Sequence, residues 1–268
     1  MTASIPAPAI ADAIVRLRAA GCVFAEDEAA VLGAAAPDQA TLSELVRRRS
    51  DGEPLEQVVG FADFCGLRVR LRPGVFVPRI RSELLVQRGA QAASAAAKGT
   101  TSAPVVVDLC CGSGALGLAV RLQVPGIDLY AADVDPVAVA CARDNFGTER
   151  DRVLPGDLFD PLPAQLEGAV HVLLANVPYV ATRHIPLLPA EARDHEPHAA
   201  LDGGDDGLDV FRAVISRAPR WLAPGAIVLC EITEAQIDAA TEAVRAAGLE
   251  PEVTHDVDLE ATIIGGRR

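Results

Sequence analysis

Long apolar runs, paired cysteine motifs and positive charge are all scarce in this sequence. No stretch of about 20 consecutive apolar residues occurs, which argues against a membrane-spanning helix. The chain does not open with a basic region followed by an apolar run and a small-residue cleavage site, so no secretory leader is expected. The six cysteines show no C-x-x-C spacing, which argues against a zinc site or a redox pair. A cytoplasmic protein with reduced thiols and no bound metal is predicted.

Acidic residues outnumber basic ones. The 268 residues include 37 Asp and Glu but 24 Lys and Arg, which gives a formal net charge of −13. Proteins that bind nucleic acids broadly through the phosphate backbone rely on clustered Lys and Arg, so a nucleic-acid partner is disfavoured. Hydrophobic residues make up 50% of the chain, enough to bury a large core, and the length allows one large domain or one domain with a small appendage. The sequence carries no signal for an oligomeric state.

Residues 1–55 show the periodicity of helices. Ala, Leu, Val and Ile recur at helical spacing in 9–20 and 26–35, and the pattern Thr41-Leu-Ser-Glu44 is typical of a capping box at the start of a third helix. A small helical N-terminal domain is therefore predicted. The basic cluster 47–49 is expected to be a solvated helix end.

Residues 56–103 are predicted to form a β-hairpin and a connecting segment. Two β-prone runs, the first of them at 58–64, flank Cys65-Gly66, a pair typical of a tight turn. A helix is expected to begin near Ser82. The Ala-rich stretch 91–104 also contains Gly, Thr and Ser, and is interpreted as the frayed end of that helix followed by a linker.

Strands and helices alternate through residues 104–268, the third predicted domain. Strands are expected at 105–110, 127–132, near 153, at 170–175 and at 226–232, with helices between them that include 115–122 and 136–146. Such alternation predicts a parallel, doubly wound α/β sheet. The last two strands, 252–257 and 261–265, are too close for a crossover helix and should therefore be antiparallel.

The tetrapeptide Asn176–Tyr179 (Asn-Val-Pro-Tyr) directly follows an apolar strand. An amide or exocyclic amine has two N–H donors, which the Asn176 side-chain oxygen and the Val177 carbonyl could accept. Pro178 restricts Val177 to extended backbone geometry, and Tyr179 offers a flat apolar wall. The pattern indicates a site for methyl transfer to a planar nitrogen. An ordinary turn is the alternative, because Asn-X-Pro often starts turns.

A glycine-rich turn joins the strand at 105–110 to the following helix. Gly112 and Gly114 would let bare backbone approach a ligand at the carboxyl edge of the sheet, and Ser113 adds a hydroxyl. Asp133 ends the next strand about 20 residues later, a position from which an acidic side chain can accept both ribose hydroxyl hydrogens. These residues predict a nucleotide-like ligand.

Two further positions concern the same ligand. Asp157 follows the third strand, where its carboxylate could bind a purine amino group while Leu158 covers the ring; a cap or turn role for Asp157 is equally open. Asp135 is near enough to compete with Asp133, but the proline behind it favours a helix N-cap. The turn lacks the third glycine of the dinucleotide fingerprint. This favours S-adenosyl-L-methionine over NAD, because the former needs no pyrophosphate cradle.

Several segments together resemble the HemK/PrmC family of protein-(glutamine-N5) methyltransferases, which are class I, Rossmann-like enzymes. They are spread over nearly the whole chain, at residues 52–60, 64–67, 73–83, 196–208, 221–225 and 265–267. The resemblance implies a seven-stranded, mostly parallel sheet with an antiparallel final strand, preceded by a small helical domain and a β-hairpin. It also implies S-adenosyl-L-methionine as cofactor and, as partner, a peptide chain release factor whose Gly-Gly-Gln glutamine is methylated on its amide nitrogen.

The resemblance assigns roles to individual residues. Asn176, Val177, Pro178 and Tyr179 would hold the substrate glutamine and form the catalytic loop. With Asp157 added from its position, the expected cofactor contacts are Cys110, Cys111, Gly112, Ser113, Gly114, Asp133, Asp157, Leu158 and Asn176.

The chain departs from the family pattern at three places. The usual Asn-Pro-Pro-Tyr is Asn-Val-Pro-Tyr, the usual Pro-Arg-Pro-x-Thr-Glu is Pro-Arg-Ile-Arg-Ser-Glu at 78–83, and two cysteines, Cys110 and Cys111, enter the glycine turn. Val177 keeps the carbonyl but adds an N–H and a softer φ, which bears on substrate identity more than on reaction type. Arg79 could steer a carboxylate or the protein substrate; an ion pair with Glu83 is the alternative.

Two other functional classes remain open. One is an amino-methyltransferase for another protein, for adenine in nucleic acid or for a small molecule, since all would use the same pair of acceptors. The other is a non-catalytic scaffold that keeps the cofactor site and uses the helical domain to bind a partner.

Overall fold

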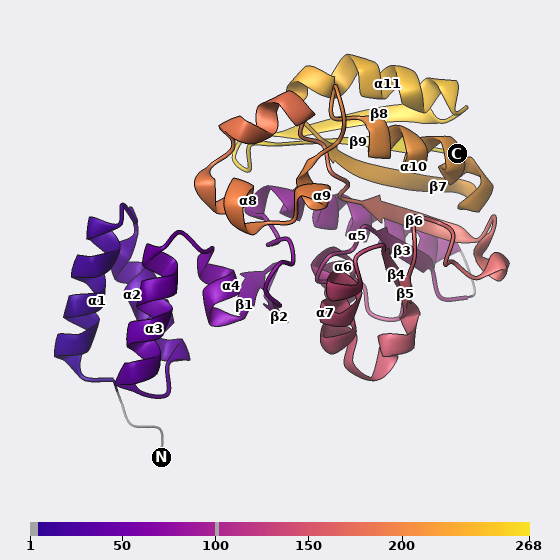
Figure 1. Ribbon diagram of the computed structural model, residues 1–268. Helices are drawn as coiled ribbons and strands as arrows, with labels where there is room; N and C mark the ends of the chain where they lie inside the picture. The colour runs from indigo at the N-terminus through magenta and orange to yellow at the C-terminus, as the bar shows by residue number, and fades with distance from the viewer. Residues whose placement is uncertain (1–4, 100–101) are drawn as a thin grey trace.

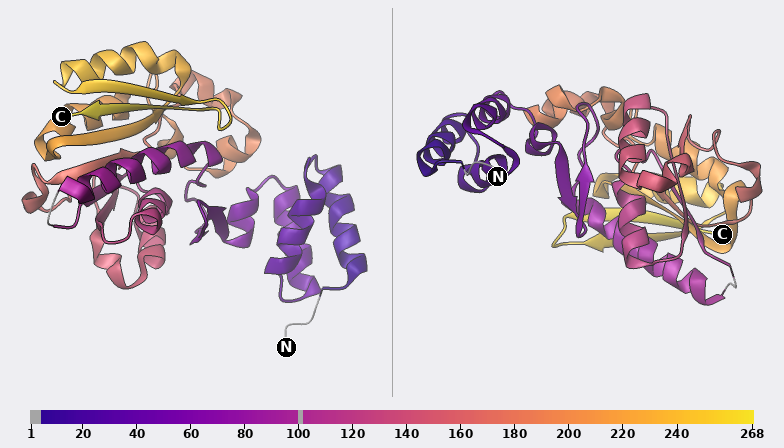
Figure 2. Two further views of the ribbon diagram at one scale, coloured as in Figure 1. Left: turned by 180° about the vertical axis from the view of Figure 1, so that it is seen from behind. Right: turned by 90° about the horizontal axis from the view of Figure 1, so that it is seen from below.

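The computed structural model describes residues 5–99 and 102–268 (Figure 1). At its N-terminal end, a bundle of helices projects from a larger α/β body (Figures 1 and 2). The bundle contains α1 (Ala7–Ala19), α2 (Ala25–Ala35) and α3 (Gln39–Ser50). It has its own small core, in which Leu17 and Leu32 are fully buried.

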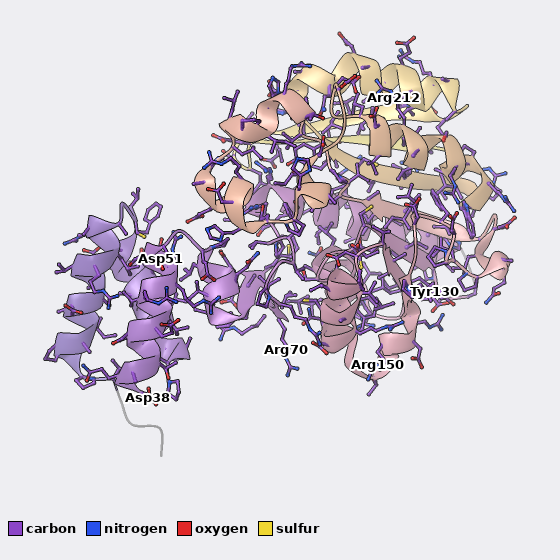
Figure 3. All side chains as sticks on the ribbon, viewed as in Figure 1. Asp38, Asp51, Arg70, Tyr130, Arg150 and Arg212 are labelled. Carbon is purple, nitrogen blue, oxygen red and sulfur yellow. The ribbon has the colours of Figure 1, made fainter. Side chains whose placement is uncertain are left out.

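Two local expectations in this region are wrong. Asp38, which is labelled in Figure 3, caps α3 in place of Thr41. Its side chain accepts a hydrogen bond from the Thr41 N–H at 2.8 Å. Residues 58 and 59, expected in a strand, end a short helix, α4 (Leu55–Val59). Proline precedes α4 and Gly60 ends it in the left-handed conformation (φ 80°), and these two signals outweigh the β propensity of the Val-Val pair.

The expected hairpin is confirmed. β1 (Phe61–Phe64) pairs antiparallel with β2 (Leu67–Arg70). The two turn residues, Cys65 and Gly66, have φ of 47° and 79°, as a two-residue turn that matches strand twist requires.

A single 3₁₀ turn, Ile80–Ser82, leads into α5 (Glu83–Gly99), so a helix does begin near Ser82. The fraying expected from residue 91 is wrong, because α5 continues to Gly99. Alanine has the highest helix propensity, and Ala93 is buried against the sheet. The linker expected after this helix falls partly on residues 100–101, outside the described residues.

One seven-stranded sheet forms the C-terminal body, in the order β5-β4-β3-β6-β7-β9-β8. The strands are β3 (Val105–Leu109), β4 (Asp128–Asp133), β5 (Val153–Pro155), β6 (Val170–Ala175), β7 (Leu222–Ile232), β8 (Glu250–Asp256) and β9 (Ala261–Arg267). The last strand, β9, lies between β7 and β8 and is antiparallel to both, whereas the pairs among β3 to β7 are parallel. The expected seven-stranded, mostly parallel sheet with an antiparallel final strand is confirmed.

Helices cover both faces of this sheet (Figures 1 and 2). On one face lie α5, α6 (Ala115–Gln123) and α7 (Pro136–Phe146), and on the other α10 (Asp209–Trp221) and α11 (Ile237–Ala246). β3 and β6 are therefore buried on both sides, which explains their uninterrupted apolar sequences. No helix in the described part of the chain has both the length and the apolar character needed to cross a membrane.

Arg49 connects the helical bundle to the α/β body. It forms ion pairs with Glu28 on α2 and with Glu191 on α8 (Ala190–His195). Its side chain is 10% exposed, so the expectation that the basic cluster is a solvated helix end is wrong for this residue.

Candidate active site

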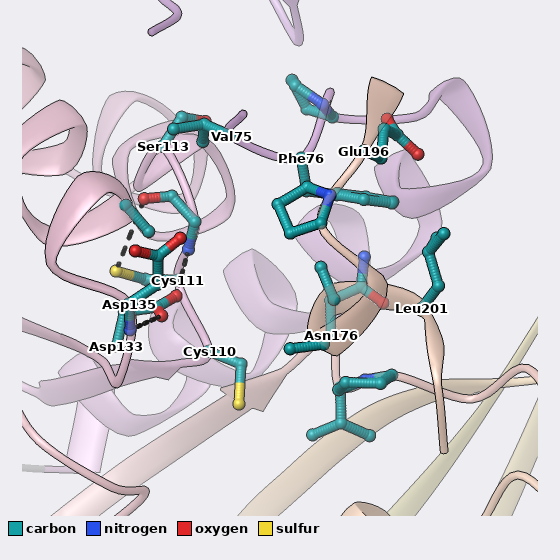
Figure 4. Close-up of a pocket in the computed structure, with 18 of the residues that line it drawn as sticks. Val75, Phe76, Cys110, Cys111, Ser113, Asp133, Asp135, Asn176, Glu196 and Leu201 are labelled. Atoms are coloured by element: carbon teal, nitrogen blue, oxygen red, sulfur yellow. Dashed lines mark hydrogen bonds between the residues drawn. The ribbon is translucent and has the colours of Figure 1, made fainter. Parts of the chain in front are cut away.

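A cavity of about 560 Å³ lies at the carboxyl ends of the parallel strands. It is lined by the loops after β3, β4, β5 and β6, by the segment before α5, and by residues of α8 and α9 (His198–Leu201). In Figure 4, Ser113, Cys111 and Asp133 lie on one side of the cavity and Asn176 and Leu201 on the other. The predicted site residues that line it are Arg79, Cys110, Cys111, Gly112, Ser113, Asp133, Asp157, Leu158, Asn176, Val177, Pro178 and Tyr179.

Gly114 is the one predicted site residue that does not line the cavity. It precedes α6 with a φ of 78°, and a Cβ there would come within 2.9 Å of the Phe146 ring. Position 114 therefore requires glycine because the turn packs closely against Phe146 of α7.

The glycine turn is tied to Asp133 across the strand ends. The Gly112 N–H donates to Asp133 Oδ2 at 2.8 Å, and the Asp135 N–H donates to Oδ1 at 2.9 Å. Burial raises the pKa of the Asp133 carboxyl. Both oxygens retain lone pairs for a pair of ligand hydroxyls. Asp135 accepts a hydrogen bond from the Val137 N–H at 2.8 Å, which confirms the expected N-cap of α7.

Asn176 is held by a residue that sequence reasoning missed. Its Nδ2 donates to Ser82 Oγ at 3.2 Å. No described residue donates a hydrogen bond to Asn176 Oδ1 or to the Val177 carbonyl oxygen. The two acceptors required to hold an NH2 group are therefore both available in the lining of the cavity.

Tyr179 is expected to offer a flat apolar surface, but it also makes polar contacts. Its hydroxyl donates to Glu231 Oε1 at 2.7 Å, and burial, followed by the nearby Glu231 carboxylate, raises the pKa of this phenol. The Gln236 side chain also donates to the Tyr179 carbonyl at 3.0 Å. Both the ring and the backbone of Tyr179 are thus fixed.

Arg79 pairs with Glu196 at 2.6 Å, so the alternative of an ion pair with Glu83 is wrong. Glu196 also accepts from the Val77 N–H at 3.2 Å, and its side chain is fully buried. Burial raises the pKa of Glu196 even though Arg79 acts in the opposite direction. Arg79 therefore connects the segment before α5 to the end of α8.

The segment 202–208 packs against the Asn176–Tyr179 segment and the residue that follows it. The Gly203 N–H donates to the Val180 carbonyl at 2.9 Å, and the Val180 N–H donates to the Leu201 carbonyl at 3.0 Å. Side chains at Gly203 or Gly207 would overlap carbonyl oxygens of Pro178 or Tyr179. This close backbone approach explains why the glycines accompany the tetrapeptide.

The side chains around the cavity suit S-adenosyl-L-methionine better than a dinucleotide. Arg79 and Arg81 line it, but each is ion-paired with a buried carboxylate, that of Glu196 or Glu231, which offsets the positive charge that would favour a pyrophosphate. Asp133 offers acceptors for ribose hydroxyls, as described above.

Within the described residues, no group of three or more His, Cys, Asp or Glu could hold a metal ion.

Beneath the glycine turn, Asp108 is buried in β3. Its Oδ2 accepts from the Gly117 N–H at 2.9 Å, whereas Oδ1 has no hydrogen-bond partner among the described residues. Burial raises the pKa of this carboxyl from 3.8 to about 7. Between these values the folded state keeps a proton that the unfolded state has released, so Asp108 lowers stability as pH rises through this window.

Asp108→Asn should therefore stabilise the fold more at high pH than at low pH. The amide is neutral throughout and keeps an acceptor for Gly117. From pH 5.5 to 8.5, the difference in free energy of unfolding between variant and parent should grow by about 2 kcal/mol, since each pKa unit corresponds to about 1.4 kcal/mol. Urea denaturation at the two pH values measures this. A difference that does not change with pH would contradict the assigned titration.

Residues 67–188 match the methyltransferase small domain family. Release factor glutamine methyltransferases from Geobacter sulfurreducens and Streptomyces coelicolor are 36% and 37% identical to this chain, over 70% and 72% of its length. The alignments cover 63% and 67% of those relatives, so the chain spans less than two thirds of the first.

A relative of another kind is also similar. The 4-amino-L-phenylalanine/4-methylamino-L-phenylalanine methyltransferase of Streptomyces pristinaespiralis is 36% identical, with 76% of this chain and 69% of that protein covered. A methyltransferase structure from Pyrococcus furiosus has the same fold, with a TM-score of 0.53 and 16% identity over 75% of this chain and 89% of that one. Together with the sheet order and the site geometry, these similarities show that the chain belongs to the HemK/PrmC family of class I methyltransferases, which includes the release factor glutamine methyltransferases.

Proposed function

We propose that this chain transfers a methyl group from S-adenosyl-L-methionine to the side-chain amide nitrogen of a protein glutamine, in the Gly-Gly-Gln loop of a peptide chain release factor. The observation that carries the proposal is the pair of free acceptors, Asn176 Oδ1 and the Val177 carbonyl, in the same cavity as Asp133. The release factor methyltransferases among the relatives support this choice of substrate.

The chain acts mainly by positioning and electrostatics. The bound cofactor supplies an electrophilic methyl on a sulfonium. Asn176 and Val177 accept the two amide hydrogens, which turns the nitrogen lone pair toward that methyl. Tyr179, anchored through its hydroxyl to Glu231, limits rotation of the bound amide. The nitrogen becomes strongly acidic once methylated, so no strong base is needed before transfer.

A labelling experiment tests this function. The chain is incubated with isotopically labelled S-adenosyl-L-methionine and a full-length release factor, and the Gly-Gly-Gln peptide is analysed by mass spectrometry. One methyl group on the glutamine is expected. A release factor with this glutamine replaced by alanine is the control and should stay unlabelled. Cofactor binding without any transfer to the release factor would contradict the proposal.

An aromatic amine is the second candidate acceptor. It is favoured by the similarity to the 4-amino-L-phenylalanine methyltransferase and by Val177, where the family tetrapeptide has proline. The same two acceptors would hold the NH2 group on a ring. The labelled cofactor and free 4-amino-L-phenylalanine test this candidate directly, and a turnover number higher than that with the release factor would favour it.

A further inference from the structure

Glu231 is a buried carboxylate at the carboxyl end of β7, outside the set of residues predicted from the sequence. Its residue exposure is 2%, and three side chains donate to it. Tyr179 OH and Arg81 Nε both donate to Oε1, at 2.7 and 3.0 Å. Ser82 Oγ donates to Oε2 at 2.6 Å. Burial of this charge is tolerated because the donors occupy both oxygens.

The contact with Ser82 fixes the direction of a hydrogen-bond chain. An ionised carboxylate only accepts, so the single hydroxyl proton of Ser82 points to Glu231. Ser82 can then offer only a lone pair to Asn176, which must present its Nδ2–H2 to Ser82. The oxygen of the Asn176 amide is thereby left for the substrate, rather than the nitrogen.

We propose that Glu231 is a positioning residue which, through Ser82, selects the orientation of the Asn176 amide that can accept a hydrogen from the acceptor nitrogen. Glu231 has no hydrogen bond to Asn176 itself, so it acts only through the Ser82 hydroxyl. The inference deepens the proposed function and rests on it, since the orientation matters only for an acceptor that carries N–H groups.

Glu231→Gln is the decisive substitution because it keeps size and changes the direction of donation. Arg81 can only donate, so the Gln oxygen must take the place of Oε1 and the amide nitrogen must face Ser82. Ser82 then accepts from Gln, and its proton is released to donate to Asn176, which favours the reversed orientation of the Asn176 amide. We expect kcat to fall on the order of 10- to 100-fold, less than for complete loss of a transition-state acceptor because part of the population keeps the parent orientation of Asn176, with the Kd for S-adenosyl-L-methionine changed by less than about twofold.

Variants at Ser82 distinguish an effect of hydrogen-bond direction from an effect of losing the Ser82 side-chain contact. Ser82→Ala removes the relay without reversing Asn176, so kcat should fall by less, about 3- to 10-fold. Ser82→Thr keeps the hydroxyl and should restore most of the activity. In the Ser82→Ala background, Glu231→Gln should add little, because no hydroxyl remains to transmit the reversal. Glu234→Gln, a change of the same kind at a side chain that is 72% exposed, is the matched control and should leave kcat unchanged.

A spectroscopic readout does not depend on turnover. The chain has only two asparagines, Asn145 and Asn176, so selective ¹⁵N-Asn labelling gives two side-chain NH2 signals. Asn145 donates to the carbonyls of Arg70 and Ser113 and serves as the internal reference. Ser82→Ala and Glu231→Gln should both shift the Asn176 signals and leave those of Asn145 in place.

The outcomes distinguish the two proposals. If the parent methylates neither a release factor nor an amine, the proposed function fails, while the NMR signals still test the relay. If the parent is active and Glu231→Gln keeps kcat within about twofold, or if its Asn176 signals do not move, the relay is wrong. Should Glu231→Gln not fold, as judged by cofactor binding, the comparison of Ser82→Ala with Ser82→Thr decides, and equal kcat values would overturn the inference.

Discussion

Asn176→Ala should lower kcat by about 100- to 1,000-fold, the usual cost of removing a group that acts mainly in the transition state. The substitution removes one of the two acceptors for the amide hydrogens and leaves the Val177 carbonyl to hold the nitrogen alone. The fold should remain intact, because Asn176 contributes one hydrogen bond, to Ser82. Single-turnover kinetics and thermal unfolding of the variant measure the two effects separately. Near-normal turnover in Asn176→Ala would show that the two-acceptor hypothesis is wrong.

Asn176→Asp refines this prediction. The substitution keeps the size of the side chain and the acceptor, but it removes the NH2 that donates to Ser82. Ser82 already gives its only proton to Glu231, so a carboxylate at position 176 would face a lone pair and would lie near a second buried negative charge. A loss of activity is therefore expected here too. Full activity in this variant would mean that the hydrogen bond from Asn176 to Ser82 has no role in orientation.

Much of the α/β body could be predicted from local sequence. The buried strands β3 and β6 are uninterrupted apolar runs, and Asp135 followed by proline marks the start of α7. The positive φ values needed at Cys65 and Gly66 likewise depend on neighbouring residues only. The wrong expectations at α3, α4 and α5 all concern where helices begin or end, which single residues such as Asp38 and Gly60 determine.

The site could be predicted only as far as the strand ends. Apart from Arg79, the predicted residues lie at or just after the end of a parallel strand, and parallel strands bring such positions together. Ser82 and Glu231 lie 149 residues apart, and Arg79 and Glu196 lie 117 apart, so no local pattern pairs them. A signal did exist at Glu231, because a single acidic residue in the apolar run of β7 must have a buried partner. Its partners followed only from the folded structure.

Gly207→Ala should reduce activity by about 100-fold, because it displaces the backbone of the Asn176–Tyr179 segment, which we propose holds the acceptor nitrogen. Gly207 has a φ of 80°, and a Cβ at this position would overlap the carbonyl oxygen of Tyr179 and the side-chain nitrogen of Gln236. Those two groups are joined by a 3.0 Å hydrogen bond. If either moves to make room for the Cβ, this hydrogen bond breaks and the backbone of Tyr179 is no longer held in place. We expect kcat to fall while S-adenosyl-L-methionine still binds, since the cofactor wall around Asp133 is built by other loops.

Gly248→Ala is the matched control for this prediction. Gly248 has a φ of 76°, and a Cβ there would meet no atom within 4 Å. Both alanines would bear the same left-handed backbone strain of about 1–2 kcal/mol, so the difference between the variants isolates the overlap with Tyr179. Gly248→Ala should lose some stability in urea denaturation and keep its kcat. If both variants lost activity to the same extent, backbone strain would account for the effect, and the packing of Gly207 on the catalytic loop would have no role in catalysis.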